Sequence, residues 1–238
     1  MFQTLLTGIW VVLITLILYP EAVLVTLFQK NGRLAHLLGR VWAKSILFVS
    51  RVKVRVIGLE NLDKNGSFIY MANHQSMFDI LVLYAYLPVQ FRWLAKIELF
   101  RIPLFGHAMS RIGCIGIDRS DGKAAYRSLM AAAQRVNNGI SVLVFPEGTR
   151  SHDGEIKPFK KGGFLLALKS KRPIVPIVIH GTHEIMRRGR IRVKPGRVVM
   201  KINQPIQTES YNKSTQKILM DRVMRVMCDS LERIKNTG

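Results

Sequence analysis

The feature that most constrains the fold is the alternation of short β-branched apolar runs with helical patterns after residue 51. Seven runs have the length and composition of strands: residues 52–57, 67–72, 91–95, 114–118, 141–145, 174–179 and 198–202. Longer stretches between them have helical periodicity, most clearly residues 122–137 and 215–234. Strands that alternate with helices form one sheet covered by helices. The sequence therefore predicts an α/β fold with a central mixed sheet flanked by helices.

The first 28 residues add a second constraint, because they are apolar and nearly uncharged. No charged residue lies between Met1 and Pro20, and another apolar run follows Glu21. A transmembrane helix needs about 20 apolar residues, a length reached here only by counting across Pro20 and Glu21. The segment therefore fits a helix that spans a bilayer or one that lies in its interface. A cleavable signal peptide is a weaker alternative, because the start lacks a basic residue.

A second apolar stretch, residues 41–49, is interrupted by Lys44 and predicts an amphipathic interfacial helix. We expect the two helices to join near Gly32 as a hairpin, so that residues 1–50 form a membrane anchor and residues 51–238 form the α/β domain. A hairpin buried in the core is the alternative. Basic residues cluster at its ends: Lys30, Arg33, Arg40, Lys44, Arg51, Lys53 and Arg55. This charge places the following domain on the cytoplasmic side of the membrane.

The protein is strongly basic, with 36 Lys and Arg against 15 Asp and Glu and a formal net charge of +21. Such a charge favours a polyanionic partner, either an anionic bilayer or nucleic acid. The apolar front end, and the absence of a nucleic-acid-binding motif, favour anionic membrane lipids and disfavour nucleic acid. Residues 185–201 carry seven bases and no acid, so we expect an exposed basic hairpin there.

The turn after the second predicted strand carries a candidate base. The segment Asn73-His74-Gln75-Ser76-Met77-Phe78-Asp79 holds a histidine and a carboxylate five residues apart. We expect His74 in the turn ahead of a helix and Asp79 in its first turn. A neutral imidazole can accept a proton from an alcohol, and a carboxylate at its other nitrogen fixes the tautomer. The alternative is an ordinary capping box with Ser76 as the N-cap.

A second polar turn, Phe145-Pro146-Glu147-Gly148-Thr149-Arg150, follows the predicted strand 141–145. The carboxyl ends of strands are where open α/β sheets bind ligands. Gly148 lets the backbone approach a ligand closely, and Arg150 offers a planar fork that suits a phosphate. Glu147 is suited to hold a hydroxyl or to orient a base. A solvated turn with an incidental salt bridge is the alternative.

Together these blocks resemble the glycerophospholipid acyltransferases, typified by bacterial 1-acyl-sn-glycerol-3-phosphate (lysophosphatidate) acyltransferases. Four blocks match in order: Asn73-His74 with Asp79, Gly116-Ile117-Asp118-Arg119, Phe145 through Arg150, and Val175-Pro176-Ile177-Val178-Ile179. Lys96-Ile97-Glu98-Leu99 resembles a further family segment. The resemblance covers residues 52–204, and the front end is similar to the two-helix anchor of bacterial members. Gly116 stands where the family more often has a bulky residue.

The resemblance implies that His74 is a general base with Asp79 behind it. It also implies that a group of residues binds the glycerol phosphate: Lys96, Arg119, Glu147, Gly148, Thr149 and Arg150. Pro176 is associated in this family with the acyl donor, although its surroundings favour a buried strand. No metal and no cofactor are implied, with acyl-CoA or acyl-carrier protein as co-substrate.

The implied reaction is transfer of a fatty acyl group to the sn-2 hydroxyl of lysophosphatidic acid, giving phosphatidic acid for phospholipid biosynthesis at the cytoplasmic face of the inner membrane. Glycerol-3-phosphate, another lysolipid or a lipid A-type acceptor would use similar blocks. A metal hydrolase using His74, His180 and His183 is disfavoured, because the intervening Gly181 predicts a turn. A non-enzymatic protein that binds anionic membranes has no use for His74 with Asp79.

Overall fold

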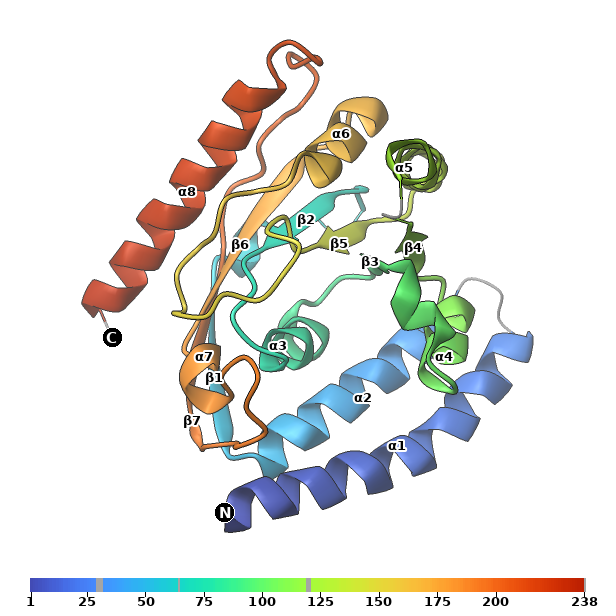
Figure 1. Cartoon of the computed structure of the whole chain (residues 1–238), viewed down its shortest axis with the longest axis vertical. Coiled ribbons are helices and arrows are strands. Elements are labelled where there is room, and N and C mark those ends of the chain that lie inside the picture. The colour runs from blue at the N-terminus through green and yellow to red at the C-terminus, as the bar shows by residue number, and fades with distance from the viewer. Residues whose placement is uncertain (29–31, 64, 119–120, 238) are drawn as a thin grey trace.

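The computed structural model describes residues 1–28, 32–63, 65–118 and 121–237 (Figure 1). Its helices are α1 (Phe2–Phe28), α2 (Arg33–Val49), η1 (Leu59–Asn61), α3 (Phe78–Tyr86), η2 (Ile97–Arg101), α4 (Phe105–Arg111), α5 (Gly122–Asn137), α6 (Lys161–Ser170), α7 (Thr182–Ile185) and α8 (Gln216–Thr237). Its strands are β1 (Val52–Ile57), β2 (Ile69–Ala72), β3 (Arg92–Lys96), β4 (Ile115–Ile117), β5 (Val142–Val144), β6 (Ile174–His180) and β7 (Gly196–Ile202). Each predicted run overlaps one of these strands, so the predicted α/β class is confirmed.

The strands form one mixed sheet in the order β1-β7-β6-β2-β5-β3-β4. β6, β2, β5, β3 and β4 run parallel to one another, whereas β7 is antiparallel to β6 and parallel to β1. The carboxyl ends of the five parallel strands therefore lie at one edge of the sheet. The loops that leave this edge are the ones in which the sequence predicts a site.

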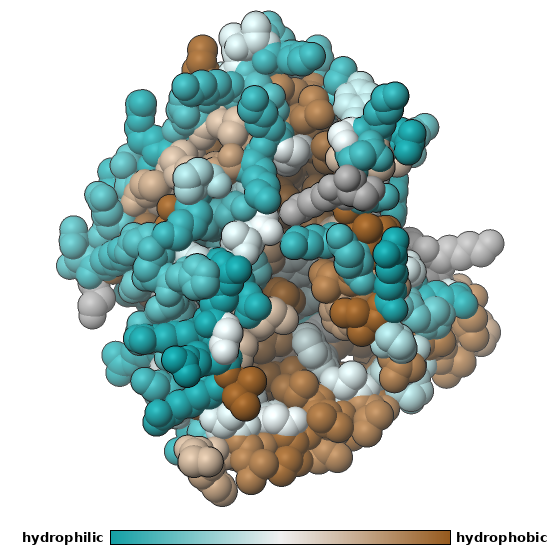
Figure 2. Space-filling model, viewed as in Figure 1, coloured by the Kyte–Doolittle hydropathy of each residue, from teal (hydrophilic) through white to brown (hydrophobic). Residues whose placement is uncertain are grey.

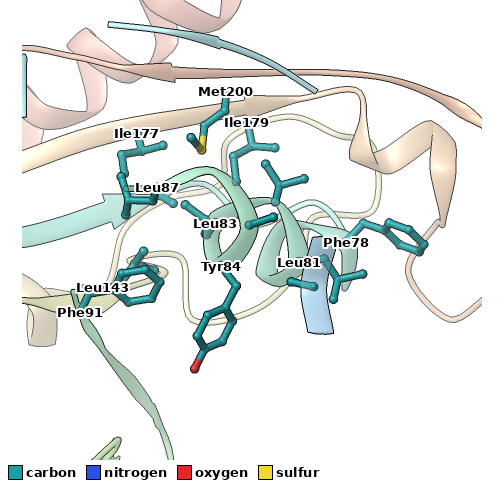
Figure 3. Packing of buried hydrophobic residues seen from close by; sticks show 14 of the residues in the cluster. Phe78, Leu81, Leu83, Tyr84, Leu87, Phe91, Leu143, Ile177, Ile179 and Met200 are labelled. Atoms are coloured by element: carbon teal, nitrogen blue, oxygen red, sulfur yellow. The ribbon is translucent and has the colours of Figure 1, made fainter. Parts of the chain in front are cut away.

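Helices cover both faces of the sheet. Figure 1 shows α5, α6 and α8 over one face, and α3 with α2 over the other. A separate hydrophobic core lies on each face: the first between the sheet and α5, α6 and α8, and the second between the sheet and α2 and α3. In β2, Ile69 and Met71 belong to the first core, and Tyr70 and Ala72 belong to the second. Side chains alternate in this way along any strand, and burial on both faces explains the continuous apolar runs. Figure 3 shows the second core, where α3 packs beneath β6 and β7.

The predicted helical hairpin is present at the start of the chain. α1 and α2 run antiparallel, and α2 begins after Gly32, whose φ of 63° is left-handed. The Trp10 indole N–H donates to Ser45 Oγ over 3.2 Å, and the Trp42 indole N–H donates to Thr15 Oγ1 over 3.0 Å. The residue farther along α1 contacts the earlier residue of α2, as antiparallel packing requires. The hairpin is thus held by polar contacts along its length.

The outer face of α1 is apolar and exposed. The helix continues through Pro20 and its 27 residues extend about 40 Å. Its exposed large apolar side chains are Phe2, Leu5, Leu6, Ile9, Val12, Leu13, Leu16, Ile17, Leu24, Leu27 and Phe28. They form much of the brown band along the lower edge of Figure 2. Among the described residues α1 is the one helix with the length and composition to cross a membrane, and its exposed face favours membrane association.

α2 belongs to both the hairpin and the core. Ala43, Ile46 and Leu47 are buried in the core that α3 shares with the sheet. The other face of α2 leaves Val41 and Phe48 exposed. The hairpin is therefore fastened to the sheet domain by the apolar packing of α2, and α1 is the outermost helix.

The expected basic hairpin at residues 185–201 is wrong in its form. Ile185 ends α7 and is buried, residues 187–195 form a loop, and the remainder is β7, which joins the sheet. Val198 and Met200 alternate into the core with exposures of at most 1%, within the predicted strand 198–202. Only the loop is the basic exposed segment that was expected.

Leu143 tests the packing of the central strand β5. Its side chain is 0% exposed and faces the α3 core. We expect Leu143→Ala to lower the free energy of unfolding by about 2–5 kcal/mol, because the change loses apolar burial and leaves a cavity. Urea unfolding in a neutral detergent measures the effect. Ile218→Ala is the control, since Ile218 is 60% exposed on α8 and its loss should change stability little.

Candidate active site

Asn73 sets the point at which the chain leaves β2. Its side-chain amide donates to the Ile179 carbonyl over 2.9 Å, and its carbonyl accepts from the Ile179 N–H over 2.7 Å. This side chain replaces the next backbone pair of the β2–β6 ladder. The backbone is thereby free to turn at His74, while the turn stays fixed to β6.

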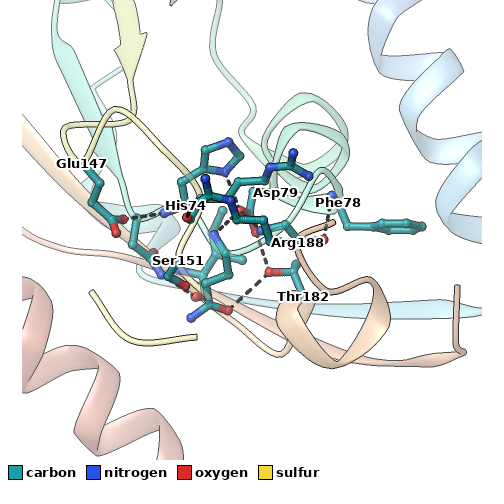
Figure 4. A network of polar contacts seen from close by, with 12 residues as sticks. His74, Phe78, Asp79, Glu147, Ser151, Thr182 and Arg188 are labelled. Atoms are coloured by element: carbon teal, nitrogen blue, oxygen red, sulfur yellow. Dashed lines mark hydrogen bonds and ion pairs between the residues drawn. The ribbon is translucent and has the colours of Figure 1, made fainter. Parts of the chain in front are cut away.

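His74 and Asp79, predicted as a pair, are hydrogen-bonded. His74 Nδ1 donates to Asp79 Oδ2 over 2.8 Å, with Asp79 fully buried and the His74 side chain 13% exposed (Figure 4). The donor assignment follows from the acceptor-only carboxylate. The His74 Nε2 atom then carries the lone pair. No hydrogen bond from a described residue occupies that atom, so it can accept a proton from a ligand.

The Asp79 carboxylate is satisfied by four donors. Besides His74, its Oδ2 accepts from the backbone N–H groups of Gln75 and Ser76 over 2.6 and 2.8 Å. Its Oδ1 accepts from the Thr182 hydroxyl over 2.5 Å. The capping interaction and the histidine contact therefore coexist on one carboxylate. This network allows a charged group at the start of α3 to be buried and to hold the imidazole in one orientation.

An aromatic floor supports the His74 ring. The ring stacks on Phe145 with a centroid separation of 3.9 Å and an interplanar angle of 8°. Phe145 in turn stacks on Trp93, with centroids 5.5 Å apart. These rings limit rotation of the imidazole and keep one side of it away from water. The stacking and the Asp79 contact together hold the ring in one orientation.

Glu147 joins two loops through backbone contacts. Its Oε1 accepts from the His74 N–H over 2.7 Å, and its Oε2 accepts from the Lys157 N–H over 2.9 Å. The residue is 2% exposed, and burial raises the pKa of its carboxyl to about 7 against the pull of these N–H groups. Its two oxygens thus join the His74 turn to the backbone at Lys157. Contact of Glu147 with a substrate hydroxyl stays a prediction.

The next residues of the same turn face outward. Gly148 has a φ of 72°, which favours glycine, and its N–H donates to the Phe145 carbonyl over 3.0 Å. Thr149 is exposed and Arg150 is half-buried. The Ser151 N–H donates to the His74 carbonyl over 2.8 Å. The turn after β5 is therefore fastened to the turn after β2.

The other predicted contacts follow different strands at the same edge. Lys96 is exposed at the end of β3. Arg119 would follow β4, but it lies outside the described residues. A side chain at Gly116 would put its Cβ 2.5 Å from Ile97 Cδ1, so the bulk common in the family at this position is supplied by η2.

Pro176 lies inside β6 and is buried, as the strand prediction required. Its carbonyl accepts from the Asn203 backbone N–H over 2.9 Å. An acyl-donor role for this residue stays a prediction. The alternative metal site is not assembled, because no group of three or more His, Cys, Asp or Glu residues among the described parts of the chain could hold a metal ion.

Two side chains of this network were not predicted. Thr182 follows β6 at the same edge as His74, so a polar residue after that strand was the available signal. Arg188 comes from the basic loop, and its Nη1 donates to the Arg150 carbonyl over 2.7 Å. Figure 4 shows both with His74 and Asp79. Nothing in the spacing of a basic run distinguishes this arginine from its neighbours.

Comparison with known proteins places the chain in a family. The sequence signature of the Acyltransferase family matches residues 53–180, which is more than half of the chain. The chain belongs to the acyltransferase family. The match begins in β1 and ends with β6, so it contains His74, Asp79 and the turn after β5.

Relatives of this acyltransferase carry more specific names. The chain is 36% identical over 205 residues to the chloroplastic 1-acyl-sn-glycerol-3-phosphate acyltransferase BAT2 of Brassica napus, covering 85% of the chain and 59% of that protein. It is 33% identical to the 1-acyl-sn-glycerol-3-phosphate acyltransferase of Saccharomyces cerevisiae, covering 90% and 71%. The chain thus spans less than two thirds of the length of several of these relatives.

A solved structure agrees with the fold. The crystal structure of the 1-acyl-sn-glycerophosphate (LPA) acyltransferase PlsC from Thermotoga maritima matches with a TM-score of 0.81 and 26% sequence identity, covering 98% of each chain. The similarity therefore includes the N-terminal hairpin as well as the sheet domain. The acyltransferase is built on the same arrangement from end to end.

Burial of Glu147 predicts a pH-dependent stability. Its pKa is raised to about 7 in the folded protein, so the protonated form of Glu147 stabilises the fold, and this stabilisation is lost as the pH rises from about 4.5 through about 7. We expect the wild-type melting temperature to fall between pH 5 and 8 more steeply than that of Glu147→Gln, which cannot ionise. Exposed Glu60→Gln is the control and should follow the wild type. Parallel curves for wild type and Glu147→Gln would contradict the assignment.

Proposed function

We propose that this acyltransferase moves a fatty acyl group from acyl-CoA or acyl-carrier protein to the sn-2 hydroxyl of lysophosphatidic acid, giving phosphatidic acid. The observation that carries the proposal is His74, held by buried Asp79 with Nε2 unoccupied at the carboxyl edge of the sheet. The names of the relatives favour this acceptor over others.

The reaction needs one group that first accepts and then returns a proton. His74 Nε2 takes the proton of the acceptor hydroxyl as its oxygen attacks the thioester carbonyl. The resulting tetrahedral oxyanion collapses, the C–S bond breaks, and the imidazolium returns the proton to the departing thiolate. Asp79 stabilises the imidazolium between these steps and keeps Nδ1 protonated. An alkoxide is too basic to form free at neutral pH, so the proton transfer is coupled to the attack.

The acceptor phosphate requires cations near this histidine. Arg150 and Lys96 leave the carboxyl ends of β5 and β3, and Arg119 follows β4 in the sequence. We assign the three to the phosphate, with Gly148 and Thr149 lining the approach. In this proposal, Glu147 sets the distance between the turn that carries His74 and the turn that carries Arg150. The Pro176 segment serves the acyl donor, and the reaction proceeds with no metal or cofactor.

The substrate and the product are both lipids, so the enzyme must reach a membrane. We propose that residues 1–50 form the anchor and residues 51–238 the catalytic domain, at the cytoplasmic face of the inner membrane. The exposed apolar face of α1 supports the anchor. The net charge of +21 supports contact with anionic lipids, where each nearby base contributes about 1 kcal/mol.

An acceptor screen with purified enzyme and palmitoyl-CoA tests the proposal. The acceptors are lysophosphatidic acid, glycerol-3-phosphate and an uncharged lysolipid, each in neutral detergent micelles. We expect lysophosphatidic acid to give the highest kcat/KM. Preference for glycerol-3-phosphate would keep the family chemistry and replace the acceptor, and equal use of the uncharged lipid would contradict a phosphate site.

Substitutions at the pair test the mechanism. We expect His74→Ala to lower kcat by about 10²- to 10⁴-fold because it removes the base. Asp79→Asn should cost about as much as the same change in a serine protease, roughly 10⁴-fold, because it presents the wrong tautomer. His107→Ala, at an exposed histidine of α4, should keep full activity. Activity retained by His74→Ala in a folded protein would refute the mechanism.

Substitutions on α1 test the anchor. Leu13 and Ile17 are 48% and 60% exposed and lie one helical turn apart. We expect the double change to Lys to shift the protein from membranes toward the soluble fraction, because charged side chains are costly in hydrocarbon. The matched control changes Tyr126 and Ile218, exposed on α5 and α8, to Lys. Equal membrane fractions for both variants in sedimentation would contradict the role of α1.

A further inference from the structure

Arg188 places a second guanidinium beside the catalytic pair. Its side chain is half-buried and lies with His74 and Asp79 in the network of Figure 4, where its Nη1 donates to the Arg150 carbonyl. A guanidinium has five N–H donors, and this bond uses one. The remaining donors are therefore available beside the turn that carries Arg150.

The backbone around Arg188 is fixed to the active-site turn. The Ser76 hydroxyl donates to the Met186 carbonyl over 2.7 Å, which ties the loop to the start of α3. The Arg190 N–H then donates to the Arg187 carbonyl over 3.1 Å and closes a β-turn, in which Gly189 has a φ of 75°. Arg188 is the second residue of that turn. It is thus presented by a constrained segment and not by a freely moving arm.

Among the described residues, the charge of Arg188 has no carboxylate partner. The adjacent Arg187 contacts Glu184 over 3.3 Å, whereas within the described parts of the chain no Asp or Glu forms an ion pair with Arg188 or with Arg150. Arg188 therefore adds a second positive charge at the turn that carries Arg150, and two such charges favour a nearby anion. A phosphate meets this need, because it accepts several N–H donors at once.

We propose that Arg188 binds the phosphate of the acyl acceptor together with Arg150 and so determines specificity for phosphate-bearing acceptors. The inference rests on the proposed function and deepens it, since it adds a contact from outside the four sequence blocks of the family. By donating to the Arg150 carbonyl, Arg188 also holds the backbone of the turn that carries Arg150.

Steady-state kinetics separate a ligand contact from a structural one. We expect Arg188→Ala to raise the KM for lysophosphatidic acid about 10- to 100-fold, the loss of a charge-assisted hydrogen bond, with kcat and the KM for palmitoyl-CoA within about threefold. Arg188→Lys should recover part of the affinity. Arg190→Ala, an exposed arginine of the same turn, is the matched control and should resemble the wild type. A lower kcat with an unchanged acceptor KM would overturn the proposal and leave Arg188 a structural role.

A binding measurement makes the inference independent of turnover. Lysophosphatidic acid in neutral micelles is titrated into each variant without an acyl donor, at several salt concentrations. We expect Arg188→Ala to bind about tenfold more weakly than Arg190→Ala, with a smaller dependence on salt. Equal affinities of the two variants would overturn the inference. A wild-type protein that binds this lipid but transfers no acyl group would instead contradict the proposed function and leave the Arg188 contact standing.

Discussion

The buried Asp79 carboxylate is the group on which the functional end of the molecule depends. Its four donors come from the His74 turn ahead of α3 and from Thr182 after β6. A charge without solvent contact tolerates only such complete hydrogen bonding. One side chain therefore sets the start of a helix, the orientation of an imidazole and the approach of a third segment. The same carboxylate therefore caps the helix and orients the proposed base, so the capping interpretation and the acid–base interpretation of Asp79 are both correct for the contacts that it makes.

Much of the fold follows from the sequence because the sheet is buried on both sides. Each run of apolar residues marked a strand, and residues 122–137 were predicted with the boundaries that α5 has. β7 was located by the apolar run 198–202, but the basic residues around it led to an exposed basic hairpin over residues 185–201, where the structure has a loop and a strand that joins the sheet. Periodicity shows where an element lies. The place of β7 between β1 and β6, parallel to the first and antiparallel to the second, arises from long-range pairing that no local pattern contains.

The candidate site could be predicted where its residues lie close together in the sequence. His74 with Asp79 and the turn from Glu147 to Arg150 stand close together in the sequence, and parallel strands bring the two turns to one edge. Thr182 and Arg188 lie far along the chain, and only the return of β6 beside β2 brings them near. The place of Glu147 in the turn after a strand suggested that it holds a hydroxyl or orients a base. Its two backbone acceptor bonds depend on a loop closure that ends at Lys157.

The contact between the basic loop and the first helix has one more consequence. Thr4 Oγ1 accepts from the Val193 N–H over 3.1 Å, so the loop that presents Arg188 is joined to the first turn of α1. If α1 rests in lipid, this joint sets how deep the reaction centre sits relative to the headgroup plane. A thicker or thinner leaflet would then tilt the opening as one body with the helix.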